Sequence, residues 1–382
     1  MDRPLYYGMI GGGPGAFIGD VHRRAIALDP NTRLVAASFS RTYESTLETG
    51  RALLMDESRL YRDYTEMAAA ERVRDDGIDF VVIVTPNVSH FEIAKSFLEA
   101  GIHVVCDKPL TTELADAEEL GRIARERNLL FGVTYTYTGY PIVKKARELV
   151  RSGALGRIRF VNAEYPQEWL ATRAESDEGN RQASWRTDPA QSGKSNCVGD
   201  IGTHVENMVS YVTGLEIDSL CARLDSFVEG RTLDDNATIM VNYKGGATGL
   251  YWTSQIAVGR DNGLRIRVFG EKGSIEFFQE EPNHLTLSML DAPTQILSRG
   301  RDSLGDRGDS LVRIPAGHPE GYFEAFANIY KTFAQALRSR IAGKTPSEDE
   351  LDFPGVDDGI QGVRFVTRVV ESSEKQGAWV KF

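Results

Sequence analysis

A glycine-rich loop directly after a short apolar run constrains the fold of this chain more than any other feature. The run covers residues 5–10, and residues 11–16 read Gly-Gly-Gly-Pro-Gly-Ala, which fits the pattern G-x-G-x-x-A. Glycines in such a turn let backbone N–H groups approach a pyrophosphate, which then lies at the positive end of the next helix. A glycine-rich turn without a ligand is the alternative interpretation. The cofactor contacts predicted in this region are Gly11, Gly13, Pro14, Gly15, Ala16, Phe17 and Ile18.

The first third of the chain alternates short apolar segments with helical ones. Strands are predicted at 5–10, 33–40, 79–85, 102–106 and 129–136, and helices at 21–28, 43–54, 90–100 and 112–127. Such alternation builds right-handed βαβ units, and therefore a doubly wound parallel sheet of the Rossmann type. This order also favours a bound dinucleotide at the glycine-rich loop. Because residues 17–19 lengthen that loop, the first helix is expected to begin near residue 19 or 20 instead of at Ala16.

The pattern changes after residue 138, where longer β-rich segments follow one another with few helices between them. These segments are 157–165, 219–228, 236–244, 247–256, 264–269 and 274–279. They predict an α+β domain with a large, mostly antiparallel open sheet, one face of which is covered by helices. The other face also needs burial, which self-association provides. The sequence thus predicts an α/β protein with an NAD(P)-binding domain at 1–138 and a substrate-binding and oligomerisation domain at 139–382.

The composition excludes several classes of partner. Lys and Arg number 44 and Asp and Glu 55, so the net charge is −11. Phosphate backbones and anionic lipid repel such a chain, and we expect neither nucleic acid nor membranes as partners. No apolar run approaches the ~18 residues of a membrane span, and the start of the sequence lacks the apolar core of a signal peptide. Three widely spaced cysteines indicate neither a disulfide framework nor a zinc ribbon. A cytoplasmic protein is expected.

The end of the second predicted strand bears on the choice of cofactor. An acidic residue at this position binds the ribose 2′-hydroxyl of NAD, whereas a basic residue favours the 2′-phosphate of NADP. The tip contains Ser40 and Arg41, and the first acid after it is Glu44. The sequence therefore leans towards NADP over NAD. A solvated surface role for Arg41 is the alternative.

Two further strand ends carry polar residues. Thr85, Pro86, Asn87 and His90 follow the buried strand at 79–85. In open α/β sheets ligands bind outside the carboxyl ends of the strands, so these residues are predicted cofactor contacts. A plain helix start, capped by the asparagine or by the serine at position 89, is the alternative and is compatible with contact.

Asp107 and Lys108 follow the next buried strand. Pro109 keeps the preceding residue out of the helical conformation, so that Lys108 points outward from the sheet edge. An amine at the mouth of a nucleotide crevice can polarise a substrate hydroxyl or take its proton. Both residues are predicted cofactor contacts, and Lys108 is also a catalytic candidate. An ordinary surface lysine is the alternative.

Asp200 and His204 open a helix in the second domain. They are four residues apart, which places both on one side of a helix. A carboxylate that orients an imidazole and stabilises its protonated form suits a general base near neutral pH. Two alternatives remain open: the aspartate only caps the helix, or the pair ligates a metal. No second pair of ligand spacing supports a metal, and none is predicted.

Together these motifs resemble the glucose–fructose oxidoreductase / inositol dehydrogenase / rhizopine-catabolism (Gfo/Idh/MocA) family. The resemblance rests on the glycine-rich loop, on residues 85–87 with His90, on Asp107-Lys108-Pro109 in place of the usual Glu-Lys-Pro, and on Asp200-x-x-x-His204. It implies a Rossmann domain that binds NAD(H) or NADP(H) and a second domain whose open sheet forms dimers or tetramers. It also implies that Lys108, Asp200 and His204 correspond to the catalytic lysine, aspartate and histidine of that family. Members typically oxidise or reduce a secondary hydroxyl of a pyranose, glycoside or cyclitol.

The sequence departs from this family where the substrate is expected. Residues 135–141 read Tyr-Thr-Tyr-Thr-Gly-Tyr-Pro, without the arginine or asparagine that many relatives carry. Residues 185–189 resemble a substrate loop of the family, and aromatic rings there can stack on the C–H face of a ring substrate. The predicted substrate contacts are Tyr137, Trp185, Arg186, Gln255 and His318.

The resulting hypothesis is an NAD(P)-dependent dehydrogenase of a sugar, glycoside or inositol, acting as a homodimer or homotetramer. His204, oriented by Asp200, accepts the hydroxyl proton while Lys108 holds the same oxygen, although the lysine and the histidine can exchange these roles. One alternative is an enzyme that retains its cofactor and interconverts sugars or breaks a glycosidic bond. Another is a non-catalytic nucleotide-dependent sensor on the same fold.

Overall fold

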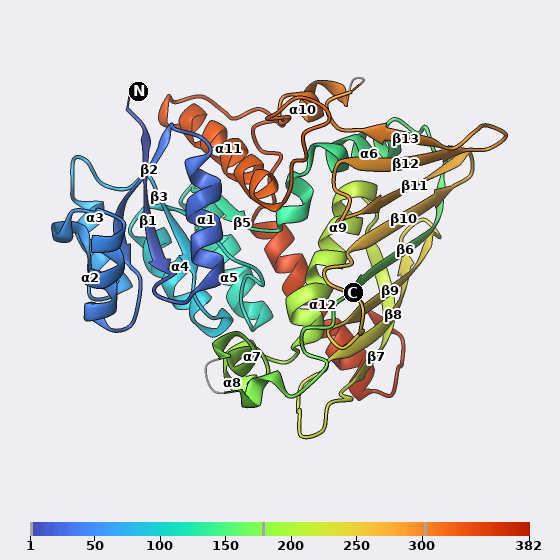
Figure 1. Ribbon diagram of the computed structural model, residues 1–382, viewed down its shortest axis with the longest axis horizontal. Coiled ribbons are helices and arrows are strands. Elements are labelled where there is room, and N and C mark those ends of the chain that lie inside the picture. The colour runs from blue at the N-terminus through green and yellow to red at the C-terminus, as the bar shows by residue number, and fades with distance from the viewer. Residues whose placement is uncertain (1–2, 178–179, 302–303) are drawn as a thin grey trace. The chain divides into compact units, whose positions relative to one another are not determined.

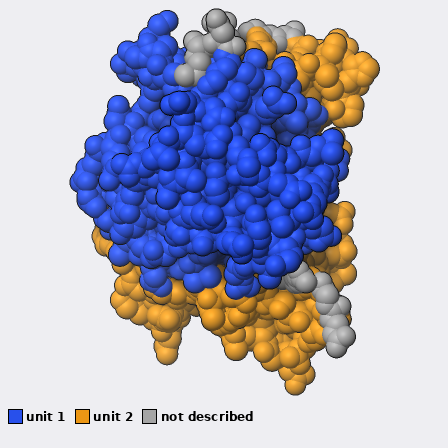
Figure 2. Space-filling model, turned by 90° about the vertical axis from the view of Figure 1, so that its left-hand side faces the viewer, with its two compact units in different colours: residues 1–136, 322–360 blue, residues 137–321, 361–382 orange. Residues whose placement is uncertain are grey.

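The computed structural model describes residues 3–177, 180–301 and 304–382 (Figure 1). They form two compact units, coloured separately in Figure 2. Unit 1 comprises residues 1–136 and 322–360, and unit 2 comprises residues 137–321 and 361–382. This division differs from the predicted domains, because the first boundary follows residue 136 instead of 138 and residues 322–360 return to the first unit.

Unit 1 contains a parallel sheet with strand order β2-β1-β3-β4-β5. The strands are β1 (Leu5–Gly11), β2 (Thr32–Ser38), β3 (Phe80–Val84), β4 (His103–Cys106) and β5 (Phe131–Val133). Every residue of β3 is buried, as its uninterrupted apolar sequence requires. The chain reverses its direction of travel across the sheet between β1 and β3, which lie side by side with Gly11 opposite Val84. This switch point is where open α/β sheets bind ligands, and the predicted doubly wound fold is confirmed.

Six helices of the described residues belong mainly to this unit. They are α1 (Phe17–Ala27), α2 (Tyr43–Ala52), α3 (Tyr64–Arg72), α4 (His90–Glu99), α5 (Leu114–Glu126) and α11 (Tyr322–Ile341). The expectation that α1 begins near residue 19 or 20 is wrong, because Ala16 is its N-cap and Phe17 its first residue. The buried positions Gly19, His22 and Ile26 share one face of the helix from its first turn onward, so packing extends the helix through the segment that looked like loop.

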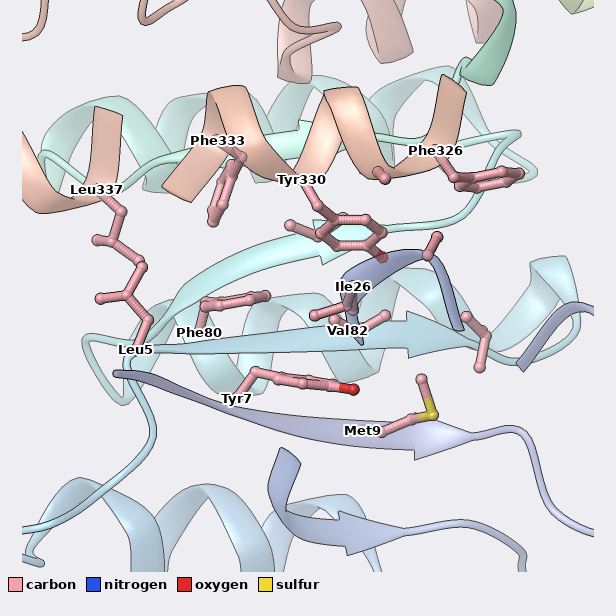
Figure 3. Close-up of a cluster of buried hydrophobic side chains, with 14 of the residues drawn as sticks. Leu5, Tyr7, Met9, Ile26, Phe80, Val82, Phe326, Tyr330, Phe333 and Leu337 are labelled. Atoms are coloured by element: carbon pink, nitrogen blue, oxygen red, sulfur yellow. The ribbon is translucent and has the colours of Figure 1, made fainter. Parts of the chain in front are cut away.

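Helix α11 completes the core of unit 1 from far along the chain. Its residues Phe326, Tyr330, Phe333 and Leu337 recur at intervals of four, three and four, which places them on one face (Figure 3). They pack against side chains of β1, β3 and α1, and the Phe333 ring lies 5.3 Å from that of Phe80. Residues 322–341 are therefore part of the dinucleotide-type unit.

Unit 2 contains a nine-stranded sheet among the described residues, in the order β13-β12-β11-β10-β6-β9-β8-β7-β14. The strands are β6 (Ile158–Pro166), β7 (Ile217–Asp225), β8 (Asn236–Tyr243), β9 (Thr248–Ser254), β10 (Arg265–Gly270), β11 (Gly273–Phe278), β12 (His284–Met289), β13 (Gln295–Ser298) and β14 (Val380–Lys381). All neighbours are antiparallel except β6 and β9, which confirms the predicted large, mostly antiparallel sheet.

Helices cover one face of this sheet. They include α6 (Pro141–Arg151) and α9 (Thr203–Thr213), which pack against each other and on several strands. The short helices α7 (Arg181–Arg186), α8 (Pro189–Ser192) and α10 (Gly305–Asp309) lie in the connections. Helix α12 (Val356–Glu374) contributes its residues from 361 onward. Across the residues that the structure describes, no helix combines the length and apolar character that a membrane crossing requires.

Candidate active site

The glycine-rich loop bends where a side chain would not fit. Gly11 and Gly15 have φ angles of +84° and +77°, a region that L residues rarely adopt. A Cβ atom on Gly11 would lie 2.9 Å from Cγ2 of Thr85, and one on Gly13 would lie 2.9 Å from the carbonyl oxygen of Phe39. The amide of Gly13 also donates to that carbonyl, over 3.1 Å. These contacts fix the loop above the switch point.

The sequence analysis missed two residues that hold this loop. Gly19 packs against Gly12 so closely that a Cβ atom on it would lie 2.4 Å from the Gly12 Cα atom. Gly19 therefore allows the close helix packing that the last small residue of a G-x-G-x-x-G/A pattern usually provides, the place that Ala16 holds in this sequence. Arg23 donates from Nη1 to the Gly12 carbonyl over 2.9 Å, and its guanidinium lies over the Phe39 ring. A buried glycine in the first turn of a helix is a recognisable signal, because glycine there needs a packing reason.

The loop fits the pyrophosphate of a dinucleotide. Pro14 and Gly15 are exposed, and the Cα atom of Gly15 faces open space. They lead into the N-terminus of the eleven-residue helix α1, whose N-cap, Ala16, has no side-chain acceptor for the first N–H groups. Free N–H groups at a positive helix end bind phosphate oxygens. Phe17 is exposed and Ile18 half-buried at the rim of this cradle.

At the end of β2, two predicted contacts lie near the surface. Ser40 is half-buried, and its Oγ accepts from the amide of Thr42 over 3.2 Å. Arg41 is exposed. Neither residue is an acid that would bind a ribose 2′-hydroxyl.

The segment after β3 is tied to the segment after β4 by one buried histidine. His90 is fully buried, its Nδ1 lies 2.9 Å from the Pro109 carbonyl oxygen, and its Nε2 lies 2.8 Å from the Thr85 carbonyl oxygen. Asn87 is buried in a short 3-10 turn, and Pro86 before it is exposed. The histidine therefore shapes the two strand ends at which cofactor contacts are predicted.

Asp107 and Lys108 lie at the end of β4 and are both half-buried. Asp107 Oδ1 accepts from Oγ1 of Thr134 over 2.6 Å and from the amide of Lys108 over 3.1 Å. The peptide bond between Lys108 and Pro109 is cis. The carboxylate is thus anchored to the neighbouring strand β5, and it anchors the main chain of the lysine in turn.

In unit 2, Asp200 lies in a π-helical turn (Val198–Gly202) that leads into α9. Its Oδ2 accepts from Nε2 of Gln255 over 2.9 Å and lies 3.4 Å from Nε of Arg186. The alternative in which Asp200 only caps the helix is wrong, since Gly202 is the N-cap residue and Asp200 bonds to other side chains. Asn196 donates to Oε1 of Gln255 over 2.8 Å and so fixes the amide orientation of the glutamine.

His204 follows in the first turn of α9 and is 8% exposed. The Tyr137 ring meets the imidazole edge-on, with 4.7 Å between ring centroids. The Tyr137 hydroxyl bonds to that of Tyr165, which donates to Oδ1 of Asn262 over 2.5 Å. Burial raises the pKa of Tyr137 to about 12, against the opposing hydrogen bonds from Tyr165 and Asn262. The histidine therefore lies against a neutral, hydrogen-bonded phenol.

Aromatic rings flank the guanidinium of Arg186. Its Cζ lies 4.3 Å from the centroid of the Trp185 ring and 5.7 Å from that of Trp169. The indole N–H of Trp169 donates to Gln167 over 3.1 Å, and Gln167 donates to Asn262 over 2.7 Å. A chain of contacts therefore leads from the carboxylate of Asp200 to the tyrosines beside His204.

The predicted substrate contacts occupy different settings within unit 2. Tyr137, Trp185 and Arg186 lie in the group around Asp200 and His204, and Gln255 is fully buried with both ends of its amide bonded. His318 is exposed and lines a surface pocket with Arg299 and Asn283, beside the ends of β12 and β13. Five residues of this group were not predicted from the sequence: Tyr165, Gln167 and Trp169, which alternate along the end of β6 and the loop after it, and Asn196 and Asn262, which come from two other connections.

Among the residues described, no group of three or more histidine, cysteine, aspartate or glutamate side chains is arranged to hold a metal ion. Unit 1 carries a dinucleotide cradle, and unit 2 carries a carboxylate and an imidazole one helical turn apart, Asp200 and His204. These are the parts that hydride transfer to or from an alcohol requires.

Comparison with known proteins supports this interpretation. Residues 5–135 match the oxidoreductase family with an NAD-binding Rossmann fold, and residues 143–276 match the GFO/IDH/MocA C-terminal domain. The chain is 38% identical to the uncharacterized oxidoreductase YfiI of Bacillus subtilis, over 100% of this chain and 98% of that protein.

Two solved structures are also similar over nearly their whole length. The inositol dehydrogenase homolog of Azotobacter vinelandii, in complex with NADH and myo-inositol, is 37% identical, with a TM-score of 0.92 over 100% of this chain and 98% of that one. Levoglucosan dehydrogenase in complex with NADH and levoglucosan is 26% identical, with a TM-score of 0.83 over 99% of both chains. Both neighbours hold NADH, so the leaning towards NADP finds no support. The chain belongs to the Gfo/Idh/MocA family of NAD-binding oxidoreductases.

Proposed function

We propose that this protein is an NAD-dependent dehydrogenase that oxidises a secondary hydroxyl of a cyclitol or related sugar ring. The observation that carries the proposal is that Asp200 and His204, one helical turn apart, lie among amide, phenol and indole side chains, with the charge of Asp200 facing Arg186, in a chain that also holds a dinucleotide cradle. Amides and phenols donate to and accept from hydroxyl groups, and indole rings cover C–H faces. This combination suits an uncharged polyol.

The residues of this chain divide the work of the reaction. His204 accepts the hydroxyl proton, and Asp200 keeps the imidazole oriented and stabilises its protonated form. Lys108 holds the same oxygen and stabilises the negative charge that develops on it. A bound nicotinamide supplies the acceptor for the hydride. The proposal requires that side chains of both units act on one substrate molecule.

NAD is the proposed physiological cofactor. The Azotobacter vinelandii homolog and levoglucosan dehydrogenase both hold NADH. Ser40 at the end of β2 is uncharged and offers no positive charge to a 2′-phosphate. Gly13, Gly15 and the first amides of α1 would hold the pyrophosphate, while Thr85, Asn87 and Asp107 lie at the strand ends where the nicotinamide half is expected.

Cyclitols are the favoured substrate class. The neighbour that holds myo-inositol is 37% identical to this chain, against 26% for the neighbour that holds levoglucosan. The test is to follow NADH formation with purified protein on inositol isomers, hexoses, glycosides and anhydrosugars, with NAD and NADP side by side. We expect the largest kcat/KM for an inositol isomer with NAD. A larger value for an anhydrosugar or a hexose would reject the cyclitol class.

Two outcomes of the same assay would point to the alternative functions. If each enzyme molecule reduces only one tightly bound cofactor and releases no NADH, the result favours the enzyme that retains its cofactor and interconverts sugars or breaks a glycosidic bond. If the protein binds NADH but oxidises no member of the panel, the result favours the non-catalytic nucleotide-dependent sensor. The intact Lys108, Asp200 and His204 favour turnover, because a sensor does not need all three.

Self-association through the open sheet is also proposed. Leu250, at the centre of β9, lies opposite Met240 on one side and Asn162 on the other, on the face away from α9. Phe160 and Phe269 form a cross-strand pair nearby and are 37% and 40% exposed. An apolar stripe on a sheet face marks an interaction surface. Light scattering should show a dimer or tetramer for the wild type and monomers for Leu250→Arg, while Leu54→Arg, an exposed residue elsewhere, leaves the assembly intact.

A further inference from the structure

Helix α1 carries a buried histidine that the proposed reaction does not use. His22 is fully buried, and its ring packs edge-on against Phe326 with 4.8 Å between centroids. Its Nδ1 lies 2.5 Å from the hydroxyl oxygen of Tyr330, and its Nε2 lies 4.0 Å from Oδ1 of Asp107. The imidazole thus stands between helix α11 and the strand end that carries Lys108.

The surroundings of His22 determine which nitrogen holds the proton. Burial lowers the pKa of His22 to about 4, with Asp107 opposing and Arg23 adding to the shift, so the ring is neutral at neutral pH. Burial also raises the pKa of Tyr330 well above its usual value, so its hydroxyl keeps its proton and has an O–H group to donate to Nδ1. A neutral imidazole has one N–H group, which then lies at Nε2 and faces a carboxylate. The opposite tautomer would turn a lone pair towards that negative charge.

The carboxylate that His22 faces is held through one oxygen. Oδ1 of Asp107 accepts from Thr134 and from the Lys108 amide. Within the described part of the chain, Oδ2 accepts no hydrogen bond, and the side chain is 16% exposed. An N–H dipole behind Oδ1 therefore draws that oxygen inward and leaves the second oxygen for a bound molecule.

We propose that His22, supported by Tyr330, is a positioning residue that fixes Asp107, so that its Oδ2 and the amine of Lys108 keep one orientation towards cofactor and substrate. The proposal rests on the proposed dehydrogenase function and deepens it. It makes α11 a part of the site, since Tyr330 is supplied more than 220 residues after the Asp107 that it supports. Misplacing a group by about 1 Å can cost ~100-fold in rate, so such support matters for kcat.

A matched pair of variants tests which nitrogen matters. The amide nitrogen of His22→Gln reaches the place of Nε2, whereas that of His22→Asn reaches only the place of Nδ1. We expect His22→Asn to lower kcat/KM for NAD about tenfold and to weaken NADH binding, and His22→Gln to restore both to within about threefold of the wild type. Equal constants for the two variants, at equal melting temperature, would overturn the proposal, because a packing role does not distinguish the nitrogens.

The route through Asp107 has its own test. If His22 acts through the carboxylate, adding His22→Asn to Asp107→Asn costs little more than Asp107→Asn alone. Additive losses would show that the histidine acts elsewhere. Tyr330→Phe should weaken NADH binding in the same direction as His22→Asn but less, because the ring stays in place, and wild-type NADH affinity in that variant would remove Tyr330 from the proposal.

A spectroscopic measurement needs neither cofactor nor substrate. Long-range ¹H–¹⁵N spectra of the apoprotein distinguish the tautomers of its six histidines, and loss of one signal set in His22→Gln assigns residue 22. A neutral ring with its proton on Nε2 at neutral pH supports the proposal, and a proton on Nδ1 overturns it. If the wild type oxidises no polyol, the dehydrogenase proposal fails, yet this spectrum and the NADH affinities still decide the role of His22.

Discussion

The two units hold their candidate functional residues in opposite ways. Unit 1 works mainly through main-chain atoms: the Gly13 amide bonds to the Phe39 carbonyl, and His90 joins the carbonyl groups of Thr85 and Pro109. Unit 2 works through side chains, with the amide of Gln255 between Asp200 and an asparagine. The difference teaches what each half tolerates. One added methyl group displaces the main chain of unit 1, whereas the loss of one amide leaves polar side chains of unit 2 with fewer hydrogen bonds.

The largest expected effect comes from the residues assigned to proton transfer. Lys108→Ala and His204→Ala should each lower kcat by about 10³-fold, within the range that acid–base groups contribute. NADH affinity should remain close to that of the wild type. Because both residues are proposed to act on one oxygen, the double variant should lose far less than the product of the single losses. Steady-state kinetics and NADH fluorescence titrations measure this.

The exposed Lys272 offers a control, and Lys272→Ala should keep full activity. Near-wild-type turnover in Lys108→Ala or in His204→Ala would contradict the catalytic role assigned to the residue that was replaced. Fully multiplicative losses would show that the two residues serve separate steps.

The next effect tests the cradle of unit 1 by adding one methyl group. In Gly19→Ala the new Cβ atom lies 2.4 Å from the Cα atom of Gly12, so loop and helix must separate. We expect a loss of about 2 kcal/mol in the free energy of unfolding together with a weakened affinity for NADH. Ala16→Gly is the matched exchange at the position that the sequence pattern favoured. Glycine serves well at an N-cap, so this variant should stay near the wild type in denaturant melts. The reverse ranking would return the packing role to Ala16.

The corresponding test in unit 2 removes one amide. Gln255→Leu removes the amide N–H that donates to Asp200 and the amide oxygen that accepts from Asn196, both in a buried setting. We expect kcat to fall about tenfold through misorientation of Asp200, with the KM for NAD unchanged. A rise in substrate KM at constant kcat would instead favour direct substrate contact by Gln255, as first predicted from the sequence.

These regions also differ in how far the sequence predicted them. The cradle, the parallel strands and the positions of Asp107 and Asp200 leave local marks: glycines that need positive φ angles, uninterrupted apolar runs and polar residues at strand ends. The role of Gly19 was not predicted, because the G-x-G-x-x-A pattern was matched to residues 11–16 and ended at Ala16. The place of helix α11 against β1 depends on long-range packing of Phe326 and Phe333 that no local pattern encodes.

The side-chain network of unit 2 shows the same limit more strongly. Trp169, Asn262 and Tyr165 meet near Asp200 and His204 only because β6 and the connections of unit 2 bring them together. Nothing in their spacing predicts it. The burial of Gln255 likewise depends on the neighbouring segments and turns a predicted substrate contact into a side chain that already serves Asp200.

Acid should destabilise the protein through two histidines of unit 1, His22 and His103. Burial lowers the pKa of His22 and of His103 from 6.5 to about 4, with Arg340 adding to the shift of His103. In this window the unfolded chain binds more protons than the native one, so stability falls as pH falls from 6.5 towards 4. Each histidine contributes about 1.4 kcal/mol per pH unit there. Urea unfolding curves at several pH values between 4 and 6.5 measure this change in the free energy of unfolding.

The variant His22→Gln has no titrating ring at this position, so its melts should show a shallower loss of stability with acid than those of the wild type. An unchanged slope would mean that His22 titrates normally in the folded protein. That result would also remove the physical basis for a neutral imidazole behind Asp107.

The smallest effect concerns the adenosine end of the cradle. Here the sequence favoured NADP, whereas NAD is the proposed cofactor. Arg41 is exposed, and exposed charges contribute about 0.2–1 kcal/mol to an ion pair. Arg41→Ala should therefore raise the KM for NADP only about threefold and leave the KM for NAD unchanged. The matched variant Ser40→Asp should suppress NADP use further, because it places an acid where a 2′-phosphate would lie. If Arg41→Ala abolishes activity with NADP and NADP proves the better cofactor in the wild type, the guanidinium reads the phosphate. Cofactor selection in unit 1 would then depend on a side chain, just as the position of Asp200 in unit 2 depends on the side chains around it.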